Sequence, residues 1–252
     1  SLPYNDISAL DAAFKEYGDD IAAVIIEPIA GNMGFIEPNI NFLKELRNLC
    51  TRNKTILIFD EVMTGFRVAR GGVQELLGVT PDLTALGKIV GGGLPVGVYG
   101  GRAEIMNNIS PDGPVYQAGT LSGNPIAVSA GTALLKQLAN TEIYTSMEEN
   151  AKKFLNPIKK YADEINIPFS FNVRGGMFGF FFSNSLPQNF DDVQKTDIEL
   201  FSKFFRKMLE RNIYLPPSAY ESCFISTLHD EDKMLKAAKL AKESLKEIKD
   251  EI

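Results

Sequence analysis

Two largely apolar runs stand near the start of the chain, at residues 21–26 and at residues 55–59, where Thr55 precedes four apolar residues. Such runs are typical of strands that are buried on both faces of a parallel sheet. Residues 41–52, which lie between the runs, repeat apolar side chains at helical spacing. An earlier helix is expected to be capped by Asn5 or Asp6. The order strand, helix, strand predicts a right-handed βαβ unit.

A right-handed crossover brings the ends of both strands to one edge of the predicted sheet, where ligands of α/β proteins bind. Both ends carry an acid, because Glu27 follows the first strand and Asp60 the second. We expect the carboxylate of Asp60 to be buried or nearly so, and therefore to need a cationic partner. A protonated pyridine nitrogen is one such partner. A helix cap or an ion pair with Arg67 or Arg70 would satisfy the carboxylate equally well.

The pattern changes along the second half of the chain, after a glycine-rich region with short strands expected near residues 83–86 and 96–99. The later elements are expected, in chain order, as helices over residues 125–139 and 141–165, strands over 169–173 and 177–182, a helix over 195–211, strands near 213 and over 224–227, and a helix over 231–247. This order predicts a large α/β domain over residues 1–150 and a C-terminal α+β domain over 151–252.

Composition and charge narrow the class of protein. The 252 residues include 26 basic and 32 acidic side chains, so the net charge is −6, and no basic block favours nucleic-acid binding. No apolar run reaches the roughly 18 residues of a membrane helix, and no signal peptide precedes the first helix. Cys50 and Cys223 lie far apart, which indicates neither a disulfide framework nor a zinc site and suits a reducing, cytoplasmic location. The sequence has a single histidine, His229, which excludes a multi-histidine metal site. We assign His229 a structural role.

Glycine and lysine usage draws attention to residues 65–123. This segment holds 14 of the 21 glycines, which is typical of backbone that turns sharply or approaches a ligand closely. Lys88 is the only lysine between Lys54 and Lys136, and apolar residues and glycines flank it. Loss of hydration would favour the neutral amine and make Lys88 a Schiff-base nucleophile. A surface lysine on a flexible loop is the commoner origin of such a pattern.

Residues 119–125 combine hydroxyl groups with a helix that begins at Pro125. A helix N-terminus with Ser or Thr hydroxyls is suited to bind phosphate. Ordinary capping by Ser122 or Asn124 explains the same residues and is the more frequent case. The glycines of residues 91–97 match neither the dinucleotide-binding motif nor the P-loop motif, so nucleotide binding is not supported.

Four segments occur in order, and they read E-P-I-A-G-N from residue 27, F-D-E-V-M-T-G-F-R from 59, L-G-K-I-V-G-G-G-L-P-V-G from 86 and G-T-L-S-G-N-P from 119. Their joint pattern resembles the class III, fold-type I family of pyridoxal-phosphate-dependent aminotransferases. Within that family it is most similar to the glutamate-1-semialdehyde aminomutases. The resemblance extends over essentially the whole chain. It implies part of a large α/β domain with a mainly parallel sheet, followed by a small α+β domain.

The resemblance implies roles for four residues around the ring of pyridoxal 5'-phosphate. Lys88 would bond covalently to the cofactor and later carry protons. Asp60 would pair with the pyridine nitrogen, and Val62 would pack on one face of the ring. Asn32 would lie near the phenolic oxygen. The same resemblance implies that the cofactor alternates with its pyridoxamine 5'-phosphate form.

Three further residues take their expected roles from the same resemblance. Gly119 and Thr120 would reach the cofactor phosphate of the neighbouring subunit, which implies a homodimer with shared active sites. Glu221 would lie near a small-molecule substrate. Neither a nucleic acid nor a membrane is an expected partner.

The resemblance favours an aminomutase over a class III ω-aminotransferase. The ω-aminotransferases generally carry Glu where this chain has Asn32, and residues 215–230 contain no Arg that could hold the carboxylate of a second keto acid. The implied reaction converts glutamate 1-semialdehyde to the tetrapyrrole precursor 5-aminolevulinate by moving an amino group within one molecule. A class III ω-aminotransferase and a noncatalytic α/β module that keeps these motifs as structure are the alternatives.

Family members are considerably longer at the N-terminus, so we expect this chain to be a C-terminal part of a longer protein. The expected missing parts are a phosphate-binding loop of small residues, an aromatic residue on the other ring face and an Arg for the substrate carboxylate. We therefore expect the chain by itself to bind the cofactor weakly or not at all and to be inactive.

Overall fold

The computed structural model describes residues 1–251, and the chain divides into two compact units. The first unit comprises Ser1–Pro28 and Pro38–Thr141, and the second comprises Ile29–Glu37 and the chain from Glu142 onward. The boundary expected after residue 150 falls inside a helix of the second unit. As a division into a cofactor-binding and a small domain, it stays a prediction.

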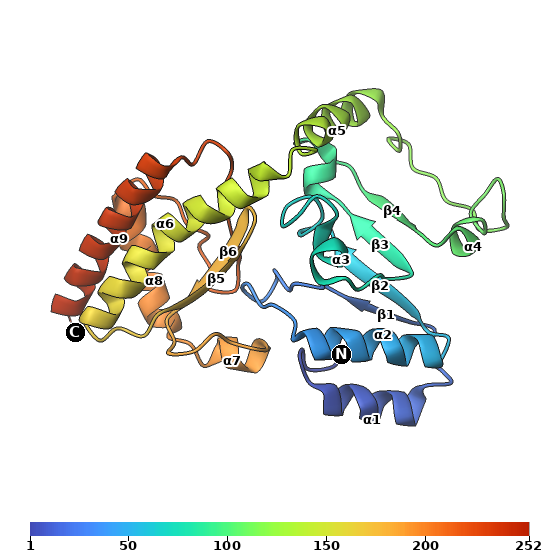
Figure 1. The fold of residues 1–252 in the computed structure, drawn as a ribbon, viewed down its shortest axis with the longest axis horizontal. Helices are drawn as coiled ribbons and strands as arrows, with labels where there is room; N and C mark the ends of the chain where they lie inside the picture. Colours follow the sequence, from blue (N-terminus) through green and yellow to red (C-terminus); the bar gives the residue numbers. More distant parts are fainter. Residues whose placement is uncertain (252) are drawn as a thin grey trace. The chain divides into compact units, whose positions relative to one another are not determined.

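The first unit is built on a four-stranded sheet with the order β1-β2-β3-β4 (Figure 1). The strands are β1 (Ala23–Ile26), β2 (Ile56–Glu61), β3 (Leu83–Leu86) and β4 (Val98–Gly101). The first three strands run parallel and β4 pairs antiparallel with β3, so the predicted mainly parallel sheet is confirmed. The strand expected over residues 96–99 starts and ends two residues later.

Six helical segments accompany this sheet. They are α1 (Ile7–Tyr17), α2 (Ile40–Arg52), α3 (Gly72–Leu77), the 3-10 turn η1 (Lys88–Gly91), α4 (Ala103–Met106) and α5 (Pro125–Gln137). Asp6, one of the two expected caps, begins α1, because its Oδ1 accepts a hydrogen bond from Ala9 N at 2.8 Å. The short segments α3, η1 and α4 were not predicted, because four to six residues are too few to show a helical period.

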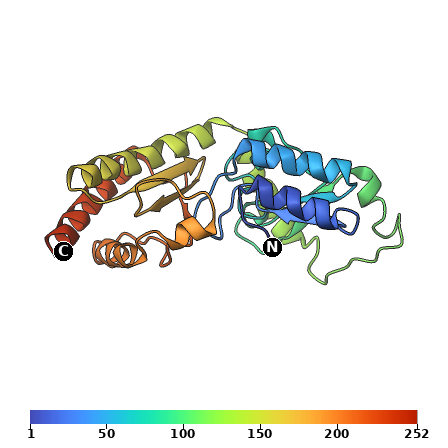
Figure 2. The same ribbon diagram turned by 90° about the horizontal axis from the view of Figure 1, so that it is seen from below.

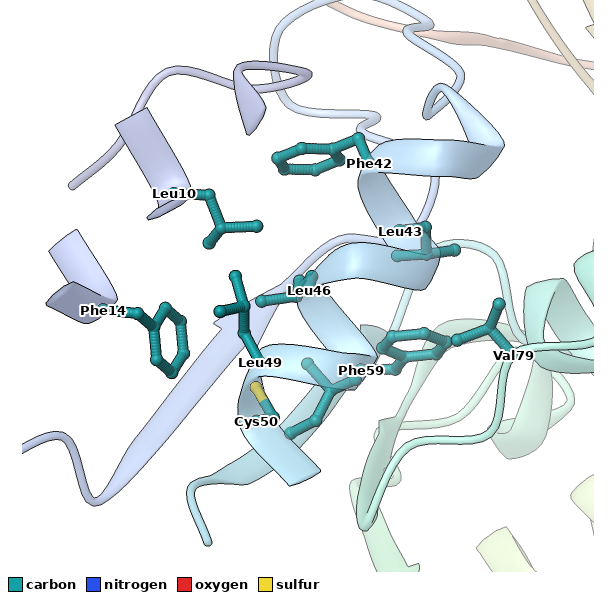
Figure 3. Close-up of a cluster of buried hydrophobic side chains, with 10 residues drawn as sticks. Leu10, Phe14, Phe42, Leu43, Leu46, Leu49, Cys50, Phe59 and Val79 are labelled. Atoms are coloured by element: carbon teal, nitrogen blue, oxygen red, sulfur yellow. The ribbon is translucent and has the colours of Figure 1, made fainter. Parts of the chain in front are cut away.

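The apolar faces of α1 and α2 form the main core of the first unit against β2 (Figure 3). Its buried members are Leu10, Phe14, Phe42, Leu43, Leu46, Leu49, Cys50, Leu57, Phe59 and Val79. Each fully buried side chain of this size contributes about 1.5–3 kcal/mol relative to an exposed one. This contact covers one face of the sheet along β2.

The opposite face of β1 is open. Val24 and Ile26 pack on the core, whereas Ile25 is 64% exposed. The expectation that this strand is buried on both faces is therefore wrong for β1, because α1 and α2 cover only one face of the sheet. The register places Ile25 beside Ile58 on this open face, and Ile58 beside Leu83.

A buried ionic cluster ties α2 to the sheet. Asp82, just before β3, pairs with Arg47 of α2 at 2.8 Å and with Arg102 at 2.9 Å, and it accepts a hydrogen bond from Leu57 N at 2.8 Å. Burial by itself would raise the pKa of Asp82. The hydrogen bond from Leu57 and the two guanidinium groups outweigh this effect and lower the pKa below its usual value.

The second unit is an α+β structure, as expected. Its antiparallel sheet has the order β5-β6-β7, with strands at Ser170–Arg174, Met177–Phe181 and Cys223–Phe224. Its helices are α6 (Glu142–Glu164), α7 (Phe190–Gln194), α8 (Ile198–Glu210) and α9 (Glu231–Asp250). Both views show α6 and α9 packed side by side (Figures 1 and 2).

The strand expected near residue 213 is absent from the described chain. Asn212 adopts a left-handed φ of 61° that ends α8, and Ile213 N donates to Met208 O at 2.9 Å. The amide of Ile213 therefore completes a helix end and takes no part in a sheet. The strand expected over residues 224–227 is likewise reduced to Cys223–Phe224.

Aromatic side chains form the core of the second unit. Phe180 stacks on Phe169 and on Phe201, with centroid distances of 5.6 Å in both pairs, and Phe182 meets Phe204 edge to face at 5.5 Å. All five are buried, so they form the hydrophobic core of this unit.

No helix of the described residues is long and apolar enough to cross a membrane. Cys50 and Cys223 are both buried free thiols. Burial raises the pKa of Cys50 to about 11 and raises that of Cys223 further, so both remain protonated at neutral pH.

Candidate active site at the carboxyl ends of β2 and β3

The strand β2 ends on two acids that face opposite sides of the sheet. Glu61 shares a face with Phe59 and is buried against the helices, whereas Asp60 shares the other face with Ile58. Asp60 is only partly buried, so the expected near-complete burial is wrong, because this face is not covered by α1 and α2. The parallel register aligns Asp60 with Ala85 of β3.

Glu61 organises the turn that follows β2. Its carboxylate is 1% exposed and accepts hydrogen bonds from Thr64 Oγ1 at 3.0 Å and from Val73 N at 2.8 Å. Gln74 Nε2 donates to Glu61 at 3.3 Å and to Thr84 Oγ1 of β3 at 3.2 Å. The sequence prediction gave Glu61 no role, although its position one residue after Asp60 on a strand puts it on the opposite face from Asp60.

Val62 links Asp60 to the segment that carries Lys88. Val62 N donates a hydrogen bond to Asp60 Oδ1 at 3.1 Å. A side-chain carbon added at Gly87 would lie 3.1 Å from Val62 Cγ1, so this glycine lets the two segments pack closely. Lys88 follows Gly87 directly. The structure therefore brings Asp60, Val62 and Lys88 together at one edge of the sheet.

The alternative partners considered for Asp60 are not seen in the structure. None of the described lysine or arginine side chains forms an ion pair with Asp60. Its hydrogen bond with Val62 N turns the backbone immediately after β2. Within the same turn, Arg67 Nε donates to Met63 O at 2.9 Å, and burial lowers the pKa of the Arg67 guanidinium.

Lys88 begins the turn η1 with a left-handed φ of 49°. For a residue with a side chain this conformation costs about 1–3 kcal/mol, and it is found most often at functional sites. The side chain is exposed, so the desolvation expected from the neighbouring sequence is not present here. The physical reason is that Gly87 and the glycines after the turn contribute no side-chain atoms that could cover the amine.

Gly119 and Thr120 lie in an exposed turn before α5. Ser122 N donates to Gly119 O at 3.0 Å within this turn. Asn124 caps α5, because its Oδ1 accepts hydrogen bonds from Ile126 N and Ala127 N at 3.0 and 3.2 Å. Capping by Asn124 is thus what the structure shows, and a role of Gly119 and Thr120 in phosphate binding stays a prediction.

Asn32 and Glu221 belong to the second unit, where two hydrogen-bonded segments hold them. Ser222 Oγ donates to Gly31 O at 3.2 Å and to Gly34 O at 3.1 Å, and Gly34 N donates to Tyr220 O at 2.7 Å. Asn32 and Glu221, which flank these contacts, are both exposed.

Glu221 also lines a mainly apolar cavity of about 450 Å³ within the second unit. Among its other lining residues are Phe154, Phe178, Leu215, Pro217, Phe224, Ile225, His229 and Met234. His229 Nδ1 accepts a hydrogen bond from Ser226 N at 3.0 Å in the turn before α9.

Comparison with known proteins identifies a family and close relatives. Residues 3–226 match the family described as aminotransferase class-III. The chain is 51% identical, over 91% of its length, to a glutamate-1-semialdehyde 2,1-aminomutase from Polynucleobacter asymbioticus. It is 48% identical, over its full length, to a glutamate-1-semialdehyde 2,1-aminomutase 2 from Exiguobacterium sp.. The chain spans 53% and 58%, respectively, of the length of these relatives.

Solved structures agree with this fold. An ω-transaminase from Sphaerobacter thermophilus superposes with a TM-score of 0.89 at 27% identity, covering 96% of this chain and 56% of that one. A transaminase with bound PLP superposes with a TM-score of 0.85 at 25% identity, covering 99% of this chain and 57% of that one. The architecture is therefore that of fold-type I PLP-dependent transferases.

Proposed function

Since the chain belongs to the class III aminotransferase family, we propose that this protein is a glutamate-1-semialdehyde 2,1-aminomutase that uses pyridoxal 5'-phosphate and its pyridoxamine form. The observation that carries the proposal is the contact of the Asp60–Val62 turn with the Lys88 segment at neighbouring parallel strand ends. The identity of about half to aminomutases over nearly the whole chain supports this choice within the family.

The residues at this edge fit the cofactor. Asp60 presents a partly buried carboxylate without an ion-pair partner among the described residues, which suits a protonated pyridine nitrogen. Val62 supplies an apolar contact for the ring, and the amine of Lys88 is accessible. Gly119 and Thr120 would reach the phosphate of the cofactor in the neighbouring subunit, and Asn32 would lie near the phenolic oxygen. When bound, pyridoxal phosphate supplies an electron sink for carbanion chemistry.

The chemistry of the chain's own side chains divides between two groups. Lys88 Nζ would hold the cofactor as a nucleophile and would carry protons as base and acid. The carboxylate of Asp60 would face the ring nitrogen and favour its protonated form by charge. The hydrogen bonds of Glu61 hold the turn that follows β2 in place. The carboxylate of Asp60 would therefore need no rearrangement during the reaction.

The substrate proposed is glutamate 1-semialdehyde, with Glu221 near it, and the product is 5-aminolevulinate. Residues 215–230 offer no Arg for the carboxylate of a second keto acid, which an internal amino transfer does not need. A class III ω-aminotransferase is the second candidate, and the superposition with an ω-transaminase favours it. Cytoplasmic location and a homodimer with shared active sites complete the proposal.

The decisive experiment supplies the full-length protein with glutamate 1-semialdehyde and no keto acid. We expect 5-aminolevulinate to form, because an aminomutase needs no second amino acceptor. Absence of product under these conditions, together with turnover once a keto acid is added, would support the ω-aminotransferase instead.

Replacing Lys88 tests its place in the mechanism. We expect Lys88→Ala to lower turnover by at least the 10²–10⁴-fold typical of lost acid–base catalysis. Lys136→Ala, which removes another exposed lysine of the same unit, should leave turnover unchanged. Undiminished turnover of Lys88→Ala would remove this residue from the reaction and would favour a noncatalytic role for the motif.

A further inference from the structure

The turn that carries Lys88 packs directly on α5, backbone against backbone (Figure 1). A methyl group added at Gly131 of α5 would approach the carbonyl oxygen of Val90 more closely than real side chains do. A methyl group added at Gly92 would lie 2.5 Å from the carbonyl oxygen of Ala130. No side chain therefore separates the turn from the helix at these points. At each of the two positions only glycine leaves room for the backbone of the other segment.

The turn itself is a closed unit. Its hydrogen bonds run from Val90 N to Gly87 O at 3.2 Å, from Gly92 N to Ile89 O at 3.0 Å and from Leu94 N to Gly91 O at 3.0 Å. Within it, Lys88 keeps its left-handed φ of 49°, which persists only where the surroundings hold it. A closed turn moves as one body, so the position of Lys88 depends on what the turn packs against.

Two contacts position this turn from different elements of the first unit. Val62 packs at Gly87, just before Lys88, and α5 packs at Val90 and beyond, just after it. The contact with α5 has no flexible side chain that could absorb a displacement, because the atoms on both sides are backbone. A shift of α5 would therefore be transmitted directly to Lys88.

We propose that Gly131 is a positioning residue for Lys88: by presenting bare backbone, α5 lets the Lys88 turn settle where its amine reaches the cofactor bound at Asp60 and Val62. This inference rests on the proposed function, since it concerns the placement of the amine that holds the cofactor. Gly131 touches neither cofactor nor substrate in this role. It acts through the backbone of Val90.

The test uses Gly131→Ala in the full-length protein. After addition of pyridoxal phosphate, the covalent product on Lys88 is trapped with borohydride and quantified by peptide mass spectrometry. The added methyl group would overpack this contact and displace the turn, so we expect the trapped fraction at limiting cofactor to fall roughly tenfold. We also expect the pH profile of the visible absorbance to shift, which a loss of folded protein alone would not produce.

Two variants serve as matched controls. Gly97→Ala adds the same methyl group to a glycine with no neighbouring atom within 4 Å, and it should leave trapping unchanged. Ala127→Gly lies on the same buried face of α5 and weakens the helix without adding atoms. This variant should lower thermal stability but leave the pH profile of the visible absorbance unchanged. A Gly131→Ala protein that traps cofactor as the wild type does would overturn the proposal.

A second measurement decides the matter if Gly131→Ala does not fold. Amide hydrogen exchange of the wild-type protein is compared with and without the cofactor bound to Lys88. We expect binding to slow exchange in α5 around Gly131 as well as in the turn, and unchanged protection of α5 would contradict the inference. Absence of any trapped product on Lys88 in the wild type would instead contradict the proposed function. In the Lys88→Ala protein we expect the hydrogen exchange of α5 to be the same with and without cofactor, and this result would distinguish the two failures.

Discussion

At the scale of single residues, two adjacent acids at the end of β2 have different physical tasks. Glu61 is buried and uses its carboxylate to satisfy backbone and side-chain donors of the following turn. Asp60, on the opposite face, is partly buried and receives one hydrogen bond from Val62 N. The alternation of a strand is what separates them, since neighbouring side chains point to opposite faces.

The matched isosteric changes Asp60→Asn and Glu61→Gln should therefore affect different properties, turnover in the first case and stability in the second. Asp60→Asn keeps the acceptor for Val62 N, so the free energy of unfolding should stay within about 0.5 kcal/mol of the wild type. Turnover should fall about 10²–10³-fold, the scale of a lost electrostatic partner of a reacting group. Glu61→Gln replaces one buried acceptor by a donor and should cost about 1–3 kcal/mol of stability.

Urea unfolding and steady-state turnover of both full-length variants provide the check. Comparable turnover of Asp60→Asn and the wild type would argue against a charged partner at the ring nitrogen. An unchanged urea midpoint in Glu61→Gln would show that its hydrogen bonds do not stabilise the turn.

At the scale of secondary-structure elements, Asp82 joins α2, β2 and the segment after β4. The lowered pKa of Asp82 means that the folded protein binds its proton less readily than the unfolded chain does. Its contribution is therefore fully present above the unfolded pKa of about 3.9 and is lost as the pH falls through the lower folded value. Asp82→Asn should destabilise the full-length protein by about 1.5–3 kcal/mol at pH 7, because its charged hydrogen bonds are lost.

The difference in unfolding free energy between Asp82→Asn and the wild type should shrink as the pH falls below about 4. Urea titrations at several pH values measure it, and Asp11→Asn, an exposed acid on α1, is the control that should show no loss. A difference that stays constant down to the acid limit would mean that the cluster does not depend on the charge of Asp82.

The longer helices and strands could be predicted from the sequence, because their patterns of apolar residues are local. The helix α2 repeats buried side chains at one face, and β2 is an apolar run that ends at the acids. The open face of β1 was not readable, since the sequence does not say which faces the helices cover. Nor was the lack of a strand near residue 213 predictable, because there Asn212 turns the chain and the amide of Ile213 donates back to Met208 O.

The site was predictable to a similar extent. Motif order proposed Lys88 and Asp60, and the parallel pairing of β2 with β3 places Asp60 on β2 and Lys88 two residues beyond the end of the neighbouring strand β3. The exposure of Lys88 and the contact of its turn with Gly131 were not predictable, because they depend on how close two backbones approach. Residue types in a motif indicate candidate chemistry, whereas the distances between elements depend on how the elements pack.

At the scale of the whole molecule, the exposed apolar side chains around Gly119 and Thr120 bear on the proposed homodimer. Tyr116 is 82% exposed, and Leu121 and Ile126 are each 73% exposed. A concentration of large exposed apolar residues is typical of a surface that contacts another chain. This supports a second copy as the partner, because the same segment is proposed to reach the cofactor phosphate of the neighbouring subunit.

Leu121→Asp should therefore weaken both the dimer and cofactor binding in the full-length protein. A buried carboxylate at an interface is costly unless it is paired, so sedimentation should show a shift from dimer to monomer. Cofactor retention on gel filtration should fall in parallel, because Gly119 and Thr120 would no longer reach the neighbouring site. Leu228→Asp, which alters an equally exposed leucine of the second unit, should change neither property. A Leu121→Asp protein that stays dimeric and retains its cofactor would place the subunit contact elsewhere and would separate Thr120 from phosphate binding.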